Sequence, residues 1–172
     1  AVAITLALLI QSAIAKPYEI PTESMDPTIQ AGDRVIANRL IYHFRDISRG
    51  DIVVFHPTDA ARQTCEPGSV STTPFVKRVI GLPGDRVEIV WQSRDVRVNG
   101  TVYTVDAARP NEPLREDPTG TRSTFEVPAG KVFVLGDNRP DSCDSHQWTD
   151  PYVPIDNVIG QAEVTYWPIR HV

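Results

Sequence analysis

Short runs of apolar, mostly β-branched residues follow one another along most of the chain, separated by glycine, proline, asparagine and aspartate. This pattern is typical of an all-β domain, because each run has the length of one strand and the separating residues favour turns. Apolar residues at helical spacing are absent after residue 17. We therefore predict antiparallel strands at residues 34–37, 51–55, 75–80, 86–91, 95–98, 101–103, 131–135 and 162–166.

The dipeptide Asn99-Gly100 separates two of these predicted strands. Both residue types accept the positive φ angles of a two-residue hairpin turn, so the sequence predicts a β-hairpin here. Two polar, proline-rich stretches, 57–74 and 106–130, are predicted as exposed loops. The second of them has room for one strand, near residues 123–127.

The first 15 residues contain no charge and no proline, and Lys16-Pro17 ends this apolar stretch. We interpret residues 1–15 as part of a transmembrane anchor whose beginning is missing. Two alternatives remain. Ala13-Ile14-Ala15 has the small-x-small pattern of a signal-peptide cleavage site, and the stretch also suits a buried helix of a soluble protein. Under either of the first two interpretations, the remainder of the chain is exported.

The length of 172 residues fits one globular unit with a small insertion. We predict a β core made of residues 16–80 and 131–172, with residues 81–130 forming an inserted β subdomain. The fifteen prolines predict few long helices, because proline interrupts helix interiors. The formal net charge of −5 gives no basic surface for nucleic acid, which we exclude as a partner.

The chain has two cysteines, Cys65 and Cys143, so only one pairing exists. An exported compartment would allow this disulfide to persist, whereas two buried free thiols are the alternative. Neither cysteine belongs to a C-x-x-C pair, and the histidines do not have the spacing of zinc ligands. We therefore expect no metal site.

Ser24 lies between Pro21 and Pro27, which hold the backbone extended, and it has Ile20 and Met25 as apolar neighbours. An exposed serine in a turn can act as a nucleophile if a base reaches it. No histidine is nearby in the sequence, so this segment taken alone also fits a proline-rich linker.

Lys77 is placed among strand-forming apolar residues, with Arg78 predicted on the opposite face. Burial would lower the pKa of the Lys77 amine, and a neutral amine can serve as a general base. A lysine whose charged end reaches water from a half-exposed strand is the alternative.

A polar cluster at residues 136–146 follows the predicted strand 131–135. Asp144 and His146 within it suggest the acid and base of a serine triad, although a solvated turn would have the same composition. His43, His56 and His171 have no acidic neighbour arranged as a triad partner, and we assign them no role.

Several motifs, in this order, resemble the type I signal peptidases, membrane-bound Ser/Lys endopeptidases that remove signal peptides from exported proteins. The resemblance covers nearly the whole chain. The matching segments are 21–28 (PTESMDPT), 32–35 (GDRV), 49–55 (RGDIVVF), 77–85 (KRVIGLPGD), 136–138 (GDN), 142–145 (SCDS) and 153–160 (VPIDNVIG).

The resemblance implies that Ser24 is the nucleophile and Lys77 the general base. It also implies that Ser142 orients the lysine amine and that Asp144 braces the loop around it. The oxyanion hole would combine the backbone N–H of Ser24 with the hydroxyl of Thr22, where many members carry serine. No metal or cofactor is implied.

The resemblance further implies that the substrate binds as an extended strand beside Ile20 and Val76. Ile20, Pro21, Met25 and Val76 would line shallow pockets that admit small side chains at the first and third positions before the cut. The implied setting is the extracytoplasmic side of a bacterial cytoplasmic membrane. Signal peptides of secretory preproteins, the lipid bilayer and the export translocon would be its partners.

Two positions depart from the family pattern. His146 stands where arginine is common, and we expect it to support the active-site loop without acting as the base. Cys143 is unusual inside this motif, and a bridge to Cys65 would pin the loop. A self-cleaving Ser/Lys peptidase of the SOS-repressor type and an exported β-rich binding module are the alternatives, although no DNA-binding head or self-cleavage site is visible.

Overall fold

The computed structural model describes residues 15–90, 93, 95–104 and 123–167. The predicted anchor, residues 1–15, lies outside this part of the chain except for Ala15, and so does His171. Within the described residues, no helix has both the length and the apolar character needed to cross a membrane.

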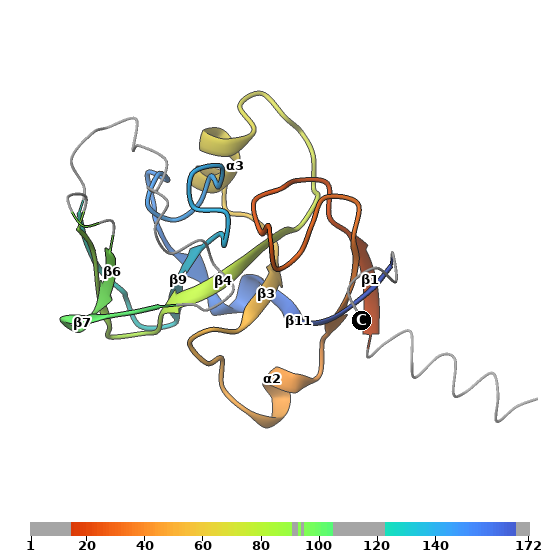
Figure 1. The fold of residues 1–172 in the computed structure, drawn as a ribbon. Helices are drawn as coiled ribbons and strands as arrows, with labels where there is room; N and C mark the ends of the chain where they lie inside the picture. Colours follow the sequence, from red (N-terminus) through yellow and green to blue (C-terminus); the bar gives the residue numbers. More distant parts are fainter. Residues whose placement is uncertain (1–14, 91–92, 94, 105–122, 168–172) are drawn as a thin grey trace, which may run out of the picture.

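The described chain is mostly β, and every strand pair is antiparallel. Seven strands form the larger sheet, in the order β1-β2-β11-β3-β4-β9-β10 (Figure 1). Their bounds are β1 Ala15–Glu19, β2 Arg34–Asn38, β3 Ile52–Phe55, β4 Phe75–Gly81, β9 Lys131–Leu135, β10 Val153–Pro154 and β11 Val158–Trp167.

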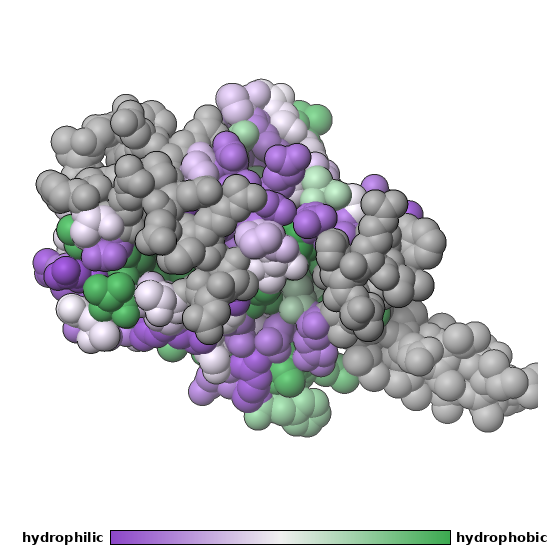
Figure 2. All heavy atoms as spheres, in the orientation of Figure 1, coloured by the Kyte–Doolittle hydropathy of each residue, from purple (hydrophilic) through white to green (hydrophobic). Residues whose placement is uncertain are grey.

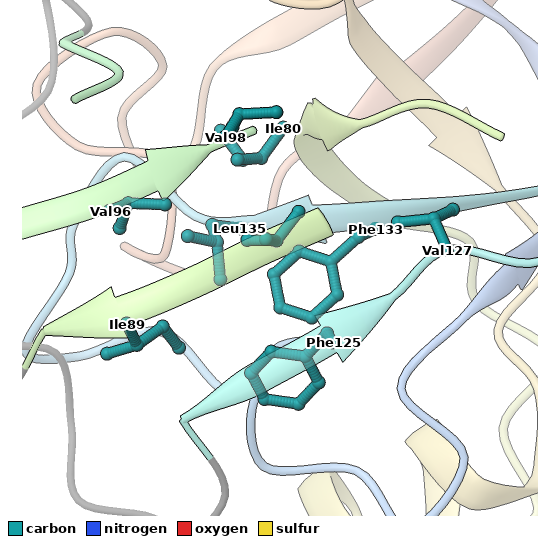
Figure 3. Close-up of a cluster of buried hydrophobic side chains, with 9 residues drawn as sticks. Ile80, Ile89, Val96, Val98, Phe125, Val127, Phe133 and Leu135 are labelled. Atoms are coloured by element: carbon teal, nitrogen blue, oxygen red, sulfur yellow. The ribbon is translucent and has the colours of Figure 1, made fainter. Parts of the chain in front are cut away.

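Four further strands form a second sheet in the order β7-β6-β5-β8. They are β5 Arg86–Val90, β6 Asp95–Val98, β7 Thr101–Val102 and β8 Thr124–Glu126. This sheet packs against the ends of β4 and β9 through a buried apolar cluster, whose side chains interlock in Figure 3. Its members are Ile80, Val87, Ile89, Val96, Val98, Phe125, Val127, Phe133 and Leu135.

Most of the predicted strands are confirmed within one or two residues at each end. The predicted hairpin is confirmed as well: Asn99 has a φ of 52° and Gly100 a φ of 82°, and β6 and β7 pair on either side of them. The strand predicted at 162–166 is longer in the structure, because pairing with β3 begins already at Val158.

β1 and β10 were not predicted from the sequence. Proline obscured both strands, since Pro17 and Pro154 lie inside them. Proline is tolerated there because β1 and β10 are the two edge strands of the larger sheet.

The stretch 57–74, predicted as a loop, contains the helix α3, Asp59–Cys65. Its N-cap, Thr58, accepts a hydrogen bond from the backbone N–H of Ala61. Two other short helical segments are α2, Ile41–Phe44, and the 3-10 turn η1, Ile155–Asn157. Each is too brief to produce a helical period in the sequence.

The surface over α2 presents hydrophobic side chains next to strongly hydrophilic ones (Figure 2). Phe44, at the end of α2, is 83% exposed. Beneath the segment that follows β1, an apolar cluster that includes Ile20, Met25 and Val54 closes one side of the larger sheet.

Candidate active site

Ser24 lies in the turn that follows β1, and its side chain is largely buried. The turn is held at its base because Ile20 exchanges two backbone hydrogen bonds with Gly32 and Asp33, each of 2.8 Å. On its far side, Ile29 N–H donates to the carbonyl of Met25. These contacts fix the backbone on both sides of the serine, so its hydroxyl has a defined position.

Lys77, on β4, donates a hydrogen bond of 2.6 Å from Nζ to Oγ of Ser24. The lysine side chain is 5% exposed. Burial lowers the pKa of Lys77 to about 8, although the carboxylates of Asp144 and Asp137 act in the opposite direction. A substantial fraction of the amine is therefore neutral at mildly alkaline pH and can accept the serine proton.

Thr22 places its hydroxyl oxygen 3.2 Å from Oγ of Ser24. Either hydroxyl can donate in this contact. The backbone N–H of Ser24 donates to no residue that the structure describes. Two donors, the Ser24 N–H and the Thr22 hydroxyl, thus lie close to the atom that would attack a carbonyl.

The loop after β9 forms hydrogen bonds to the backbone of the turn that carries Ser24. The backbone N–H of Asn138 donates to the carbonyl of Ser24 at 3.1 Å, and its side-chain Nδ2 donates to the carbonyl of Glu23 at 3.0 Å. Gly136 permits this approach: a Cβ on it would lie 2.4 Å from the Ser24 carbonyl oxygen. Any larger residue at 136 would push the loop away from the turn.

Asp137 ties the same loop to β4. Its fully buried carboxylate forms a bidentate ion pair with Arg78, with contacts of 2.6 and 2.8 Å. Thr28 donates a third hydrogen bond of 2.5 Å to it. The next residue along β4 after Lys77 therefore anchors the loop that grips Ser24.

Asp144 and His146 form a buried pair in which Oδ1 and Nδ1 are 2.5 Å apart. The other carboxylate oxygen accepts the backbone N–H of Gly136 at 2.9 Å. Burial alone would raise the pKa of Asp144, but His146 and the Gly136 N–H outweigh it and the pKa is lowered. The imidazole thus contacts the loop's acidic residue, and the hydrogen bond to Ser24 Oγ comes from Lys77.

Ser142 differs from its predicted contact. Its Oγ is buried and lies near the carboxylate of Asp144, whose pKa it helps to lower, and it does not reach the Lys77 amine in this structure. The reason is packing: a Cβ on Gly136 would lie 2.2 Å from this oxygen, so Ser142 sits directly against the Gly136 backbone.

Cys65 and Cys143 form a disulfide. It joins the last residue of α3 to the loop that follows β9, which lie side by side in Figure 1. The indole N–H of the buried Trp148 donates to Sγ of Cys65 at 3.1 Å. The bridge therefore connects the loop 136–146 to an element 78 residues earlier in the chain.

A cavity of about 290 Å³ opens beside Ser24 and Lys77. Ile20, Pro21 and Val76, three of the residues predicted to contact substrate, line it. Met25 does not line it: this side chain is fully buried and packs in the apolar cluster beneath the turn. The prediction for Met25 is corrected on that point. We refer to this space as the catalytic cavity.

Ser24, Lys77 and Thr22 were identified as candidates from the sequence, but the residues that hold them in place were not. Arg78, Asp137, Asn138 and Thr28 were given no role. A signal was present for one of them, because a strand arginine opposite Lys77 needs a counter-charge. No group of three or more His, Cys, Asp or Glu within the described residues is arranged to hold a metal ion.

The chain is similar to known proteins along nearly its whole length. The family model described as "Signal peptidase, peptidase S26" matches residues 1–167. The chain is 40% identical to Signal peptidase I of Leptolyngbya laminosa over 98% of its own length and 77% of that protein. It is also 40% identical to Probable signal peptidase I-1 of Synechocystis sp., over 97% of the chain and 79% of that protein.

A chloroplast protein, Thylakoidal processing peptidase 1 of Arabidopsis thaliana, is 38% identical over 96% of the chain and 46% of its own length. The family match spans nearly all of the sequence, and it includes every segment that builds the site described above. The chain belongs to the signal peptidase family, peptidase S26.

Proposed function

We propose that this protein is a signal peptidase, a serine endopeptidase that cleaves signal peptides from exported preproteins, with Ser24 as nucleophile and Lys77 as general base. One observation carries the assignment of roles: the amine of a buried lysine, with its pKa lowered to about 8, donates to Oγ of Ser24 at 2.6 Å. Nucleophile and base are therefore within proton-transfer distance before substrate binds.

The reaction begins when neutral Lys77 accepts the Ser24 proton and Oγ attacks the scissile carbonyl carbon. The resulting oxyanion is bound by the Ser24 N–H and the Thr22 hydroxyl. Collapse of this intermediate breaks the C–N bond, and the Lys77 ammonium returns a proton to the leaving amine. Water then attacks the acyl-Ser24 ester with Lys77 again as base, which releases the signal peptide and regenerates the serine.

The substrate enters the catalytic cavity as an extended strand beside Ile20 and Val76. Ile20 and Val76 are more than nine-tenths buried and so offer little free surface to a ligand. The pockets that they line in the catalytic cavity are therefore shallow. Small side chains such as alanine fit the first and third positions before the cut, and this gives the preference for Ala-x-Ala sites.

The remaining polar residues act through the loop at 136–146. Asp144 and His146 brace it, Asp137 and Arg78 fasten it to β4, and Ser142 reaches the lysine amine after a rotation of its side chain. These are positioning roles, because none of these groups contacts Ser24 Oγ in the structure.

We further propose that residues 1–15 anchor the protein in a bacterial cytoplasmic membrane, with the β domain on the extracytoplasmic side. Preproteins would then reach it from the export translocon. Residues 16–80 and 131–172 form the catalytic core in this view, and residues 81–130 form an inserted subdomain.

The proposal is tested by incubating the purified chain, in detergent, with a preprotein that has a single Ala-x-Ala site. Mass spectrometry of the product should give one new N-terminus, directly after that site. A matched preprotein with a bulky residue at the position before the cut is the control and should stay intact. Failure to cleave the first substrate, or equal cleavage of both, would contradict the proposal.

A further inference from the structure

A second, larger cavity of about 960 Å³ adjoins the catalytic cavity. Thr73 and Pro74, which lead into β4, line both cavities. The two spaces therefore meet along this segment. We call the larger one the distal cavity.

A second wall, formed by β1 and the residues after it, also runs from the distal cavity to the catalytic cavity. Lys16 and Tyr18 on β1 line the distal cavity, whereas Ile20 and Thr22 line the catalytic cavity. Alternate residues of a strand point to the same face, so Lys16 and Tyr18 share one face of β1, and Ile20 follows directly after the strand ends. At about 3.3 Å per residue, the stretch from Lys16 to Ile20 adds room for about four residues of an extended ligand.

The distal cavity has a positive lining, in contrast to the net charge of −5 of the whole chain. The permanent cations of Lys16 and Arg39 line it, together with the imidazole rings of His43 and His56, against one carboxylate, that of Asp156.

Neither Lys16 nor Arg39 forms an ion pair with any residue in the described ranges. The amine of Lys16 lies 5.3 Å from the ring centre of Tyr18, on the cavity wall. Two unpaired permanent cations beside one carboxylate create a local field that attracts negative charge.

We infer that the distal cavity binds the preprotein segment that lies about four to seven residues before the cut, and that it favours an acidic side chain there. The inference rests on the proposed function, because it extends the same substrate strand from Ile20 towards Lys16. The shared lining residues and the continuous wall along β1 favour a peptide over an isolated ion or headgroup.

The test uses three fluorescent peptides that share one Ala-x-Ala site and differ at a single position, five residues before the cut, where they carry Asp, Gln or Lys. The readout is the ratio of kcat/KM for the Asp peptide to that for the Gln peptide, in neutral detergent. We expect a ratio of about five for the wild-type chain, falling as salt is added.

Lys16→Gln/Arg39→Gln should bring this ratio close to one, and Arg39→Glu should shift the preference to the Lys peptide. Arg86→Gln is the matched control, because Arg86 is an exposed cation on the second sheet, paired with Glu88 and Glu126. It should keep the wild-type ratio.

Binding of the same peptides to Ser24→Ala, measured by fluorescence anisotropy, gives a readout that needs no turnover. A lower Kd for the Asp peptide supports the inference, and equal Kd values for the three peptides overturn it whether or not the wild type cleaves them. A loss of cleavage with the binding preference intact would instead count against the proposed function. If the three peptides bind equally, and the chain instead binds phosphatidylglycerol vesicles in a way that requires Lys16 and Arg39, the cavity is a lipid headgroup site and the inference is wrong.

Discussion

The Nζ atom of Lys77 lies 2.6 Å from Oγ of Ser24, although 53 positions separate the two residues in the chain. The lysine comes from the middle of a paired strand, whereas the serine lies in a turn outside the sheet. Asn138 connects the two, because it belongs to the loop after β9, the strand next to β4, and it bonds the Ser24 carbonyl. The reactive pair therefore depends on contacts made by residues that take no part in the chemistry.

Thr22→Val removes one of the two proposed oxyanion donors while keeping the shape of the side chain. We expect kcat to fall by about 10² to 10³, with a much smaller change in KM, because the lost hydrogen bond forms mainly in the transition state. Thr22→Ser is the matched control and should keep most of the activity. Steady-state kinetics on one Ala-x-Ala peptide measures both, and a Thr22→Val enzyme as active as the wild type would remove Thr22 from the oxyanion hole.

Lys77→Met should change how stability depends on pH. The pKa of Lys77 is lowered from 10.5 to about 8 by burial, so the folded state binds this proton less tightly than the unfolded state. Burial of the protonated amine therefore lowers the free energy of unfolding by roughly 3 kcal/mol below pH 8. This loss disappears as the pH rises from 8 towards 10.5.

The measurement is urea unfolding of wild type and Lys77→Met at pH 7 and pH 10. The wild type should gain unfolding free energy relative to the variant between these two values. Taking the difference between the two proteins cancels the titration of the other lysines. A difference that does not change with pH would mean that the Lys77 amine is not desolvated in the folded protein.

Most of the strands could be predicted from the sequence, because alternation of apolar and polar residues and the residues that favour turns are local signals. Arg86–Val90 and the hairpin at Asn99-Gly100 illustrate this, since each is determined by neighbours within a few residues. β1 and α3 could not be predicted in this way. An edge strand that contains Pro17 resembles a linker, and a seven-residue helix has too few turns to show a period.

In the candidate site, too, some residues could be predicted from the sequence and others could not. Ser24 and Lys77 were identified from their motifs, and Lys77 stands out even alone as a lysine in an apolar strand. The ion pair of Asp137 with Arg78, the Asn138 contact with the serine turn and the burial of Met25 arise from tertiary packing between segments far apart in the chain. No local pattern encodes such contacts.

The disulfide between Cys65 and Cys143 should stabilise both the fold and the loop at 136–146. Closing a loop of this length corresponds to about 4 to 5 kcal/mol in the chain-entropy model. Cys65→Ser/Cys143→Ser, or reduction of the wild type, should lower the Tm and reduce activity. A reductant that frees two titratable thiols and leaves both quantities unchanged would show that the bridge does not support the site.

His146→Arg should remain active. Arginine carries a permanent cation that can pair with the buried Asp144, so the brace on the loop is retained. His146→Leu is the contrasting variant: it leaves the Asp144 carboxylate without this partner and should lose about 3 to 5 kcal/mol of stability. Activity and unfolding free energy of the two variants give the comparison, and an inactive but fully folded His146→Arg would point to a specific role of the imidazole.

The most direct test of the Ser24 and Lys77 assignment is preprotein cleavage by wild type, Ser24→Ala and Lys77→Ala across pH 6 to 10. Wild-type kcat/KM should rise about tenfold per pH unit at low pH and level off near pH 8, as the Lys77 amine loses its proton. Both variants should lack cleavage while remaining folded, as shown by a cooperative unfolding transition in urea. Full activity in either variant, or a wild-type rate that is constant across this range, would contradict the mechanism.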